Sequence, residues 1–445
     1  MASITVEGKH PLVGEVRVSG AKNVATKVIC ASLFSSEDIV LENVPRVTSV
    51  INDLELIKSI GGTAIWTGTN TVTVNGSNIN TYDVPYELGS RTKTSVLLTG
   101  PLLFRFGKAR IPKFAPETFK PGPLNRFIDT WERLGVRVEE NDIFYELDAS
   151  AIKSSNILFS LPTHMGTDSA ILSSLFVPGE TIIDNASEEI EVDSLMDFCN
   201  LIGGSVTRVD PKRLSIKGTN IFKGGKYKLS PDKAEIAVFA SLAILTNGNI
   251  IVKGADRVAM IPFVNFLTKI GARYEFVDEG LKVWHDGSPL NPVDVTIAPT
   301  PGLVPDWKPL LILLLLKADG VSIVHDTVYV DRNEFTKDLN RMSAGLEVLK
   351  PSDVDLTPVI SDDSYSIDTQ GEPSTIIRVS GPCKLRGEKL HIDDTQYGAV
   401  LVLAALFAEG KSCISGIENV DYHFERFVEK LKNLGAKITA YESDD

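Results

Sequence analysis

One α/β pattern recurs six times along this chain of 445 residues. Each copy contains an apolar helix, a turn, a short run of β-branched residues, a polar link and an amphipathic helix that ends in glycine. The β-branched runs, for example residues 39–41 and 181–183, favour strands. Glycine after a helix takes the left-handed conformation without a Cβ clash, so it marks a helix end. The closing glycines are Gly61 and Gly62, Gly135, Gly204, Gly271, Gly345 and Gly435.

The length of the repeat limits how the copies can be arranged. They recur roughly every 70 residues, whereas an ordinary solenoid repeat has about 20–50 residues. We therefore predict an α/β protein with two lobes of three copies each. The polar, glycine-containing link at residues 224–230 precedes the fourth copy and is the predicted boundary. A ligand is expected in the cleft between the two lobes.

Charge and apolar content exclude several classes of partner. The chain carries 45 Lys and Arg against 58 Asp and Glu, a net charge of −13, so we expect no nucleic-acid or membrane partner. The longest apolar run, residues 309–316, is far shorter than the roughly 20 residues that span a bilayer. The four cysteines form no CxxC pair, which fits a reducing compartment. Because the first residues also lack the apolar core of a signal peptide, we expect a cytoplasmic protein.

The first helix of each copy is predicted to begin with residues suited to an anion. Ser, Thr and Asp occur there, in places together with Lys, as in residues 19–23 and 89–93. The unpaired N–H groups of a helix start attract anions, although the same residues also serve as plain N-caps. The sequence has no GxxxxGK(S/T), GxGxxG, HExxH or GxSxG motif and no metal-ligand spacing among its six histidines. We therefore expect neither P-loop, Rossmann nor metal chemistry.

Five segments spread over the chain carry a family signature. They are SGAKN at 19–23, GPLLFRFGKA at 100–109, DNASEEIEVD at 184–193, VPDWKPL at 304–310 and DLNRMSAGLEV at 338–348. With these segments the chain resembles the enolpyruvyl transferase family. The resemblance implies two inside-out α/β barrels, each built from three of the six copies. Residues 1–21 together with 230–445 are expected to form one lobe, and residues 22–229 the other.

The chemistry implied by this resemblance is transfer of the enolpyruvyl group of phosphoenolpyruvate to a hydroxyl, with release of phosphate. The acceptor is expected to be a nucleotide-sugar of the UDP-N-acetylglucosamine type, which belongs to peptidoglycan precursor synthesis. The expected partners are therefore these small-molecule substrates. The resemblance implies no cofactor and favours a monomer, but the sequence leaves the oligomeric state open.

The resemblance also assigns roles to residues. Lys22 contacts both substrates, Asp306 is the base beside the acceptor hydroxyl, and Glu117 lies nearest to the position of the family's acid. Asp306 is equally suited to cap a predicted helix at 307–317. For Glu117 the base rate of exposed Glu favours a solvated loop residue over an acid. The implied substrate-binding residues are Asn23, Arg91, Lys93, Lys120, Leu124, Asn125, Arg126, Thr163, His164, Gly166, Val328 and Arg332.

The chain departs from the family at the loop and at phosphate-binding positions. The loop at 112–127 has no cysteine, although the family's acid is one. Lys93, Gly122, Gln396 and Tyr422 stand where arginines are usual, and Lys only partly replaces a bidentate Arg–phosphate contact. Two alternatives therefore stay open. One is a paralogue that binds a nucleotide-sugar or another phosphorylated ligand without transfer, and the other is a transferase with a different acceptor.

Overall fold

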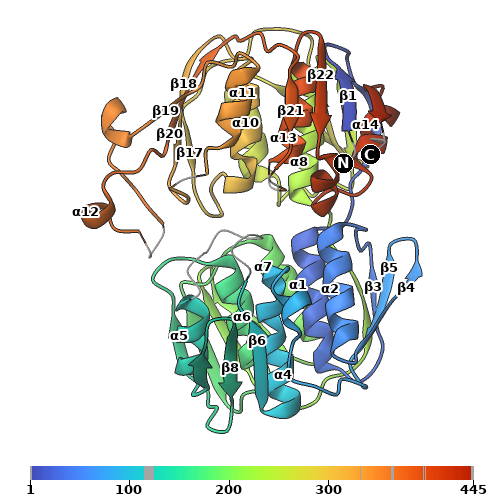
Figure 1. The fold of residues 1–445 in the computed structure, drawn as a ribbon, viewed down its shortest axis with the longest axis vertical. Helices are drawn as coiled ribbons and strands as arrows, with labels where there is room; N and C mark the ends of the chain where they lie inside the picture. The colour runs from blue at the N-terminus through green and yellow to red at the C-terminus, as the bar shows by residue number, and fades with distance from the viewer. Residues whose placement is uncertain are drawn as a thin grey trace. The chain divides into compact units, whose positions relative to one another are not determined.

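The computed structural model of the chain describes residues 3–114, 125–330, 332–361, 365–393, 395 and 397–441. The chain forms two compact units, each with its own hydrophobic core. Unit 1 comprises Met1–Ser19 and Pro231–Asp445, and unit 2 comprises Gly20–Ser230. Both units combine helices and strands (Figure 1), which confirms the predicted α/β class. No helix among the described residues is long and apolar enough to cross a membrane.

The strands of the described ranges form six small sheets, three in each unit. In unit 2 the strand orders are β13 (Gly225–Lys228), β3 (Ile39–Glu42), β5 (Thr71–Asn75), β4 (Thr63–Gly68); β11 (Ser205–Asp210), β12 (Arg213–Lys217), β10 (Glu180–Asp184), β9 (Asn156–Leu158); and β6 (Lys108–Pro112), β8 (Phe144–Asp148), β7 (Arg137–Glu140). In unit 1 they are β21 (Lys389–His391), β22 (Lys411–Ser415), β1 (Ser3–Glu7), β23 (Lys437–Tyr441); β15 (Arg273–Val277), β16 (Gly280–Trp284), β14 (Asn249–Lys253), β2 (Val13–Arg17); and β17 (Val295–Ile297), β18 (Gly320–Asp326), β20 (Ile376–Gly381), β19 (Glu347–Leu349). Each β-branched run of the repeat therefore lies in a sheet of its own.

The sheets repeat one plan, as the copies in the sequence do. In each four-stranded sheet one inner strand has a parallel neighbour on one side and an antiparallel neighbour on the other, as β14 has in β2 and β16. The three-stranded sheet is antiparallel throughout, and a single parallel bridge between Asp83 and Arg110 stands in for its fourth strand.

The predicted link at 224–230 is not a plain linker. Gly225–Lys228 forms β13, which pairs in parallel with β3. Tyr227 packs its ring against Phe198, with the ring centroids 5.5 Å apart, and donates its hydroxyl hydrogen to the carbonyl of Ser194 at 2.9 Å. Because Gly225–Lys228 is polar except for Tyr227, its sequence resembles a loop, and only these contacts of the folded chain make it an edge strand.

Nearly all side chains of the first helix of each copy are buried. In strands such as β10, by contrast, only every second side chain is buried. In each unit the buried first helices lie towards the centre and the sheets lie outside them (Figure 1). The core of each unit is therefore built by helices that are apolar on nearly all sides. These buried helices are α1 (Lys22–Ala31), η2 (Lys93–Leu98) with α4 (Thr99–Phe106), α6 (His164–Ser174), α8 (Lys233–Leu245), α10 (Lys308–Leu315) and α13 (Gly398–Phe407).

The second helix of each copy ends near a glycine with a left-handed backbone. The φ angles of Gly61, Gly135, Gly203, Gly271 and Gly435 lie between 77° and 111°, which confirms these five predicted helix ends, with Gly203 in place of Gly204. In the fifth copy the prediction of Gly345 is wrong, because the helix ends at Arg341 and Ser343, with a φ of 75°, takes the left-handed position. A Cβ at Gly135 would stand 2.5 Å from the carbonyl oxygen of Ala151. These second helices are α2 (Thr48–Ser59), α5 (Asn125–Arg133), α7 (Ile190–Leu201), α9 (Ile261–Lys269), α11 (Phe335–Arg341) and α14 (Phe427–Asn433). Short turns are η1 (Ser32–Phe34), α3 (Tyr86–Gly89), η3 (Pro305–Trp307), η4 (Pro351–Val354), α12 (Ile367–Gln370) and η5 (Ile417–Tyr422).

Candidate functional site

Lys22 and Asn23 form the first turn of α1, where the chain enters unit 2. Gly20 lies so close to Asn43 that a Cβ there would stand 1.8 Å from the Asn43 carbonyl oxygen, which explains the glycine in SGAKN. No side chain caps α1, and the side chains of Lys22 and Asn23 are half-buried. A lysine in the first turn of an uncapped helix suits an anionic ligand.

Asp53 on α2 is a buried carboxyl group that sequence reasoning missed. Its Oδ1 accepts hydrogen bonds from the hydroxyls of Thr92 at 2.8 Å and Thr94 at 2.7 Å. Because these threonines flank Lys93, the bonds fix the segment that carries this predicted binding residue. Burial raises the pKa of Asp53 to about 7, although the two hydrogen bonds and the charge of Lys22 oppose the shift.

The raised pKa of Asp53 makes the stability of the protein depend on pH. Between the usual Asp pKa of 3.8 and the folded-state value of about 7, the folded chain holds a proton that the unfolded chain has lost. The free energy of unfolding therefore falls as pH rises through this range, and the contribution of Asp53 stays constant above it. In Asp53→Asn this part of the pH dependence is expected to vanish in urea unfolding from about pH 4 to about pH 8. A difference between wild type and variant that is the same at every pH would contradict the assignment.

Other predicted residues of unit 2 lie at its surface. The Arg91 side chain is exposed and pairs with Glu87 on α3, with Nη2 and Oε2 3.7 Å apart. Asn125 and Arg126 begin α5, where Asn125 is exposed and Arg126 is half-buried. The predicted acid and two predicted binding residues, Glu117, Lys120 and Leu124, lie outside the described residues.

Thr163, His164 and Gly166 form the start of α6. Thr163 is the N-cap, and its Oγ1 accepts the N–H of Gly166 at 3.3 Å. Nε2 of His164 is hydrogen bonded to Nζ of Lys27, and Lys27 pairs with the buried Asp168 at 2.8 Å. The Lys27–Asp168 pair therefore holds the His164 ring at this helix start.

Asp306 in unit 1 lies in η3, directly before α10. The N-cap residues of these two helices are Val304 and Trp307, and neither makes a side-chain capping hydrogen bond. Asp306 stands at neither cap position, so its interpretation as an N-cap is wrong. Burial raises the pKa of Tyr329; the Arg332 guanidinium opposes this shift and the Asp306 carboxylate adds to it. The guanidinium carbon of Arg332 lies 3.4 Å from the centroid of the Tyr329 ring. The Arg332 side chain therefore packs on Tyr329, and the exposed carboxylate of Asp306 is near enough to act on the same group electrostatically.

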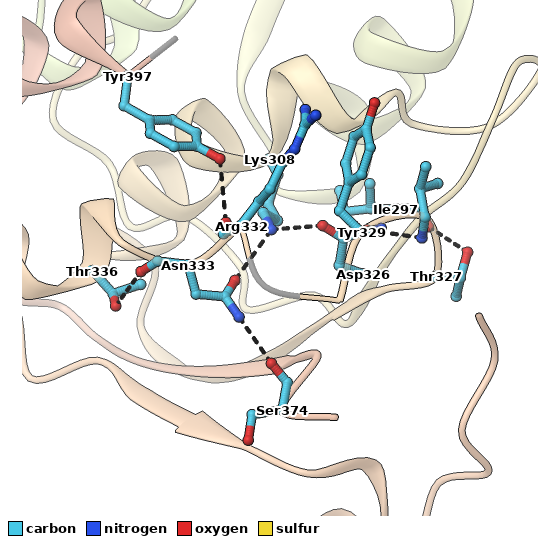
Figure 2. Close-up of polar contacts among 11 residues, drawn as sticks. Ile297, Lys308, Asp326, Thr327, Tyr329, Arg332, Asn333, Thr336, Ser374 and Tyr397 are labelled. Atoms are coloured by element: carbon cyan, nitrogen blue, oxygen red, sulfur yellow. Dashed lines mark hydrogen bonds and ion pairs between the residues drawn. The ribbon is translucent and has the colours of Figure 1, made fainter. Parts of the chain in front are cut away.

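Val328 and Arg332 lie in a turn that is organised by a buried ion pair (Figure 2). Lys308 Nζ lies 2.6 Å from Asp326 Oδ2, and their side chains are only 2% and 1% exposed. Oδ1 of Asp326 accepts the N–H of Val328 at 2.9 Å, and Lys308 donates to the carbonyl of Arg332 at 2.9 Å. Sequence reasoning missed Lys308. Its signal was a lysine in an otherwise apolar helix, KPLLILLL, because a buried charge needs a partner.

Comparisons with known proteins cover almost the whole chain. A family model described as EPSP synthase (3-phosphoshikimate 1-carboxyvinyltransferase) matches residues 6–431. The chain is 29% identical over 439 residues to UDP-N-acetylglucosamine 1-carboxyvinyltransferase 2 of Carboxydothermus hydrogenoformans, covering 98% of this chain and 99% of that protein. It is 28% identical over 438 residues to UDP-N-acetylglucosamine 1-carboxyvinyltransferase of Desulforapulum autotrophicum, with the same coverage.

A solved structure shares the fold. The enolpyruvyl transferase NikO from Streptomyces tendae superposes with a TM-score of 0.85 at 23% identity, over 99% of both chains. At this identity the likeness speaks for the fold alone. The family model, however, spans both units and includes the helix starts that carry Lys22, His164 and Asp306. The chain therefore belongs to the enolpyruvyl transferase family.

Proposed function

We propose that this protein transfers the enolpyruvyl group of phosphoenolpyruvate to a hydroxyl of UDP-N-acetylglucosamine and releases phosphate. The observation that carries the proposal is the similarity, over 98% of the chain, to relatives that are named for this carboxyvinyl transfer. The Lys-Asn pair at the start of α1 and the exposed carboxylate before α10 support it, because the resemblance assigns substrate contact to the first and the base to the second.

The proposed roles follow from charge and placement. In the overall reaction the acceptor oxygen bonds to the central carbon of the enolpyruvyl group, the bond from this carbon to the phosphate oxygen breaks, and the hydroxyl proton leaves. Asp306 suits the base because its carboxylate is exposed and caps no helix. Lys22 suits the cation that balances the anionic donor at the positive end of α1. Glu117 is proposed to protonate the methylene carbon on addition, and that proton is lost again when phosphate leaves.

The proposal also covers the barrel architecture of each unit and the residues that bind the nucleotide-sugar. Each unit is proposed to be an inside-out barrel, which is supported by its buried central helices and outer sheets. Thr163, His164 and Gly166 at the start of α6, and separately Val328 and Arg332 in their turn, are proposed as residues that bind the nucleotide-sugar. The held ring of His164 and the anchored backbone of Val328 support this assignment, since ordered groups lose little entropy on binding.

Phosphate release tests the proposed function directly. Purified protein is given phosphoenolpyruvate and UDP-N-acetylglucosamine, and each substrate is omitted in turn. We expect release only when both are present, and we expect Glu117→Gln to slow it by roughly 10²-fold or more. A Glu117→Gln variant as fast as wild type would remove Glu117 from the proposal but leave the transfer itself intact.

The two alternatives give different results in the same assay. A paralogue that binds without transfer would release no phosphate, yet its melting temperature would rise with UDP-N-acetylglucosamine. A transferase with another acceptor would show neither release nor stabilisation with this nucleotide-sugar, and it would release phosphate when the correct hydroxyl compound replaced it. Either result would overturn the proposed acceptor.

A further inference from the structure

The turn that carries Val328 and Arg332 is held from one side by a single buried lysine. We define the Arg332 turn as residues 326–330 and 332–333. Lys308, at the start of α10, donates to the side chain of Asp326 at 2.6 Å, the carbonyl oxygen of Arg332 at 2.9 Å and the side-chain oxygen of Asn333 at 3.2 Å. In Figure 2 these three contacts converge on the Lys308 ammonium group. One side chain therefore connects the two ends of the Arg332 turn.

Further hydrogen bonds hold both ends of the Arg332 turn. Asp326 Oδ1 accepts the N–H groups of Val328 at 2.9 Å and Tyr329 at 3.0 Å. Asn333 donates its side-chain N–H to the carbonyl of Ser374 at 2.8 Å, next to β20. Only the bonds to Asp326, to the Arg332 carbonyl and to Asn333 share the ammonium group, so its loss releases these three partners together. The bonds from Val328 and Tyr329 to Asp326 and from Asn333 to Ser374 do not involve it, and the Arg332 carbonyl also accepts from the Tyr397 hydroxyl at 3.4 Å.

The contacts of Lys308 exceed what charge neutralisation requires. A buried Asp needs one cation, and Asp326 has it in Lys308. The further bonds to the Arg332 carbonyl and to Asn333 instead determine the path of the main chain on which the Arg332 side chain stands. Because Lys308 follows Asp306 by two residues at the same helix start, it also links the proposed base to this turn.

We propose that Lys308 is a positioning residue, which clamps the Arg332 turn so that Val328 and Arg332 meet the acceptor substrate in a fixed geometry. Lys308 itself touches no substrate in this proposal. The effect on the acceptor rests on the proposed function, whereas the clamping of the turn is a property of the free protein.

Lys308→Met and a matched control separate positioning from stability. Met keeps the length of the side chain and removes the ammonium group. The control, Lys430→Met, breaks another lysine–carboxylate pair of unit 1, in which Glu235 is also buried. In Lys308→Met the KM for UDP-N-acetylglucosamine is expected to rise by about ten- to a hundredfold, while the KM for phosphoenolpyruvate stays within a factor of about three. Lys430→Met is expected to lower the melting temperature without changing either KM. An unchanged acceptor KM in Lys308→Met would overturn the proposal.

A double variant tests whether the effect is only structural. Lys308→Met/Asp326→Asn removes both charges, and the Asn oxygen can still accept the N–H groups of Val328 and Tyr329. Its melting temperature is expected to recover most of the loss, because no unpaired charge stays buried, but its acceptor KM is expected to stay high. Recovery of both quantities together would overturn the positioning role.

Hydrogen exchange tests the clamping of the Arg332 turn without any substrate, so its result does not depend on the proposed function. In the substrate-free protein, the amides of Val328 and Tyr329 are expected to exchange at least about tenfold faster in Lys308→Met than in wild type or Lys430→Met. If wild type releases no phosphate, the proposed function fails, and the exchange rates alone decide whether Lys308 clamps the turn. Equal exchange in all three proteins would show that it does not.

Discussion

Asp306→Asn is expected to reduce kcat for phosphate release by about 10²- to 10⁴-fold, the range that a general base contributes. The Asn amide has nearly the same shape as the carboxylate but cannot accept the hydroxyl proton. Asp306 is exposed and caps neither η3 nor α10, so its replacement should change the free energy of unfolding by no more than about 0.5 kcal/mol. A large loss of kcat with unchanged stability would therefore be the signature of a catalytic group.

The matched control for this experiment is Asp319→Asn. Asp319 is also exposed and follows the same helix, α10, at its other end, so it shares the net charge change but not the position. It should keep the wild-type kcat. If Asp306→Asn retained more than about a tenth of the wild-type kcat, the base would have to be sought elsewhere.

Lys27→Met is expected to lower the free energy of unfolding by about 3–5 kcal/mol, the usual cost of leaving a buried charge without its partner. The Lys27 side chain is 4% exposed and that of Asp168 is 0% exposed. Burial already raises the pKa of Asp168 to about 6, and Lys27 opposes that shift. Without Lys27 the pKa rises further, so Asp168 takes up a proton more readily in the folded chain. The destabilisation should therefore be smaller at about pH 5 than at about pH 7.

Calorimetry at these two pH values would measure the effect, because the two units can unfold as separate transitions. Lys58→Met is the matched control in unit 2. Its partner Glu55 also lies 2.8 Å away, but both side chains are about half exposed, so a loss of at most about 1 kcal/mol is expected. Equal losses for the two lysines would mean that burial of the Lys27–Asp168 pair does not determine its importance.

The features that the sequence predicts well are those that depend on neighbours in the chain. The strands of the six copies and the glycines at the helix ends follow from β-branched runs and from the left-handed conformation, which are local properties. The strand β13 was missed because its pairing with β3 joins residues far apart in the sequence. The α/β class could thus be predicted from the repeat, but not the partner of every strand.

The candidate site residues were predicted from the family resemblance more than from the properties of the residues themselves. The buried polar residues that were missed share one cause. Asp53, Lys27 with Asp168, and Lys308 with Asp326 are charged groups inside the cores. Nothing in a single sequence tells a buried Asp from an exposed one until the partner is known. Conversely, Asp306 looked equally suited to cap a helix, and only the helix start at Lys308 removes that interpretation. The roles of Lys22, Glu117 and the substrate-binding residues stay predictions.

The first and last strands of the chain lie side by side, and this placement affects how the protein can form during synthesis. β1 pairs with β22 on one side and with β23 on the other, so its partners leave the ribosome only when almost all of the chain has been made. Unit 2 is one continuous stretch and can fold as soon as it emerges, because domains generally fold as units during translation. Unit 1 must wait, with its first two strands exposed. Unit 2 can therefore be completed early, whereas unit 1 is completed only after β22 and β23 have been made.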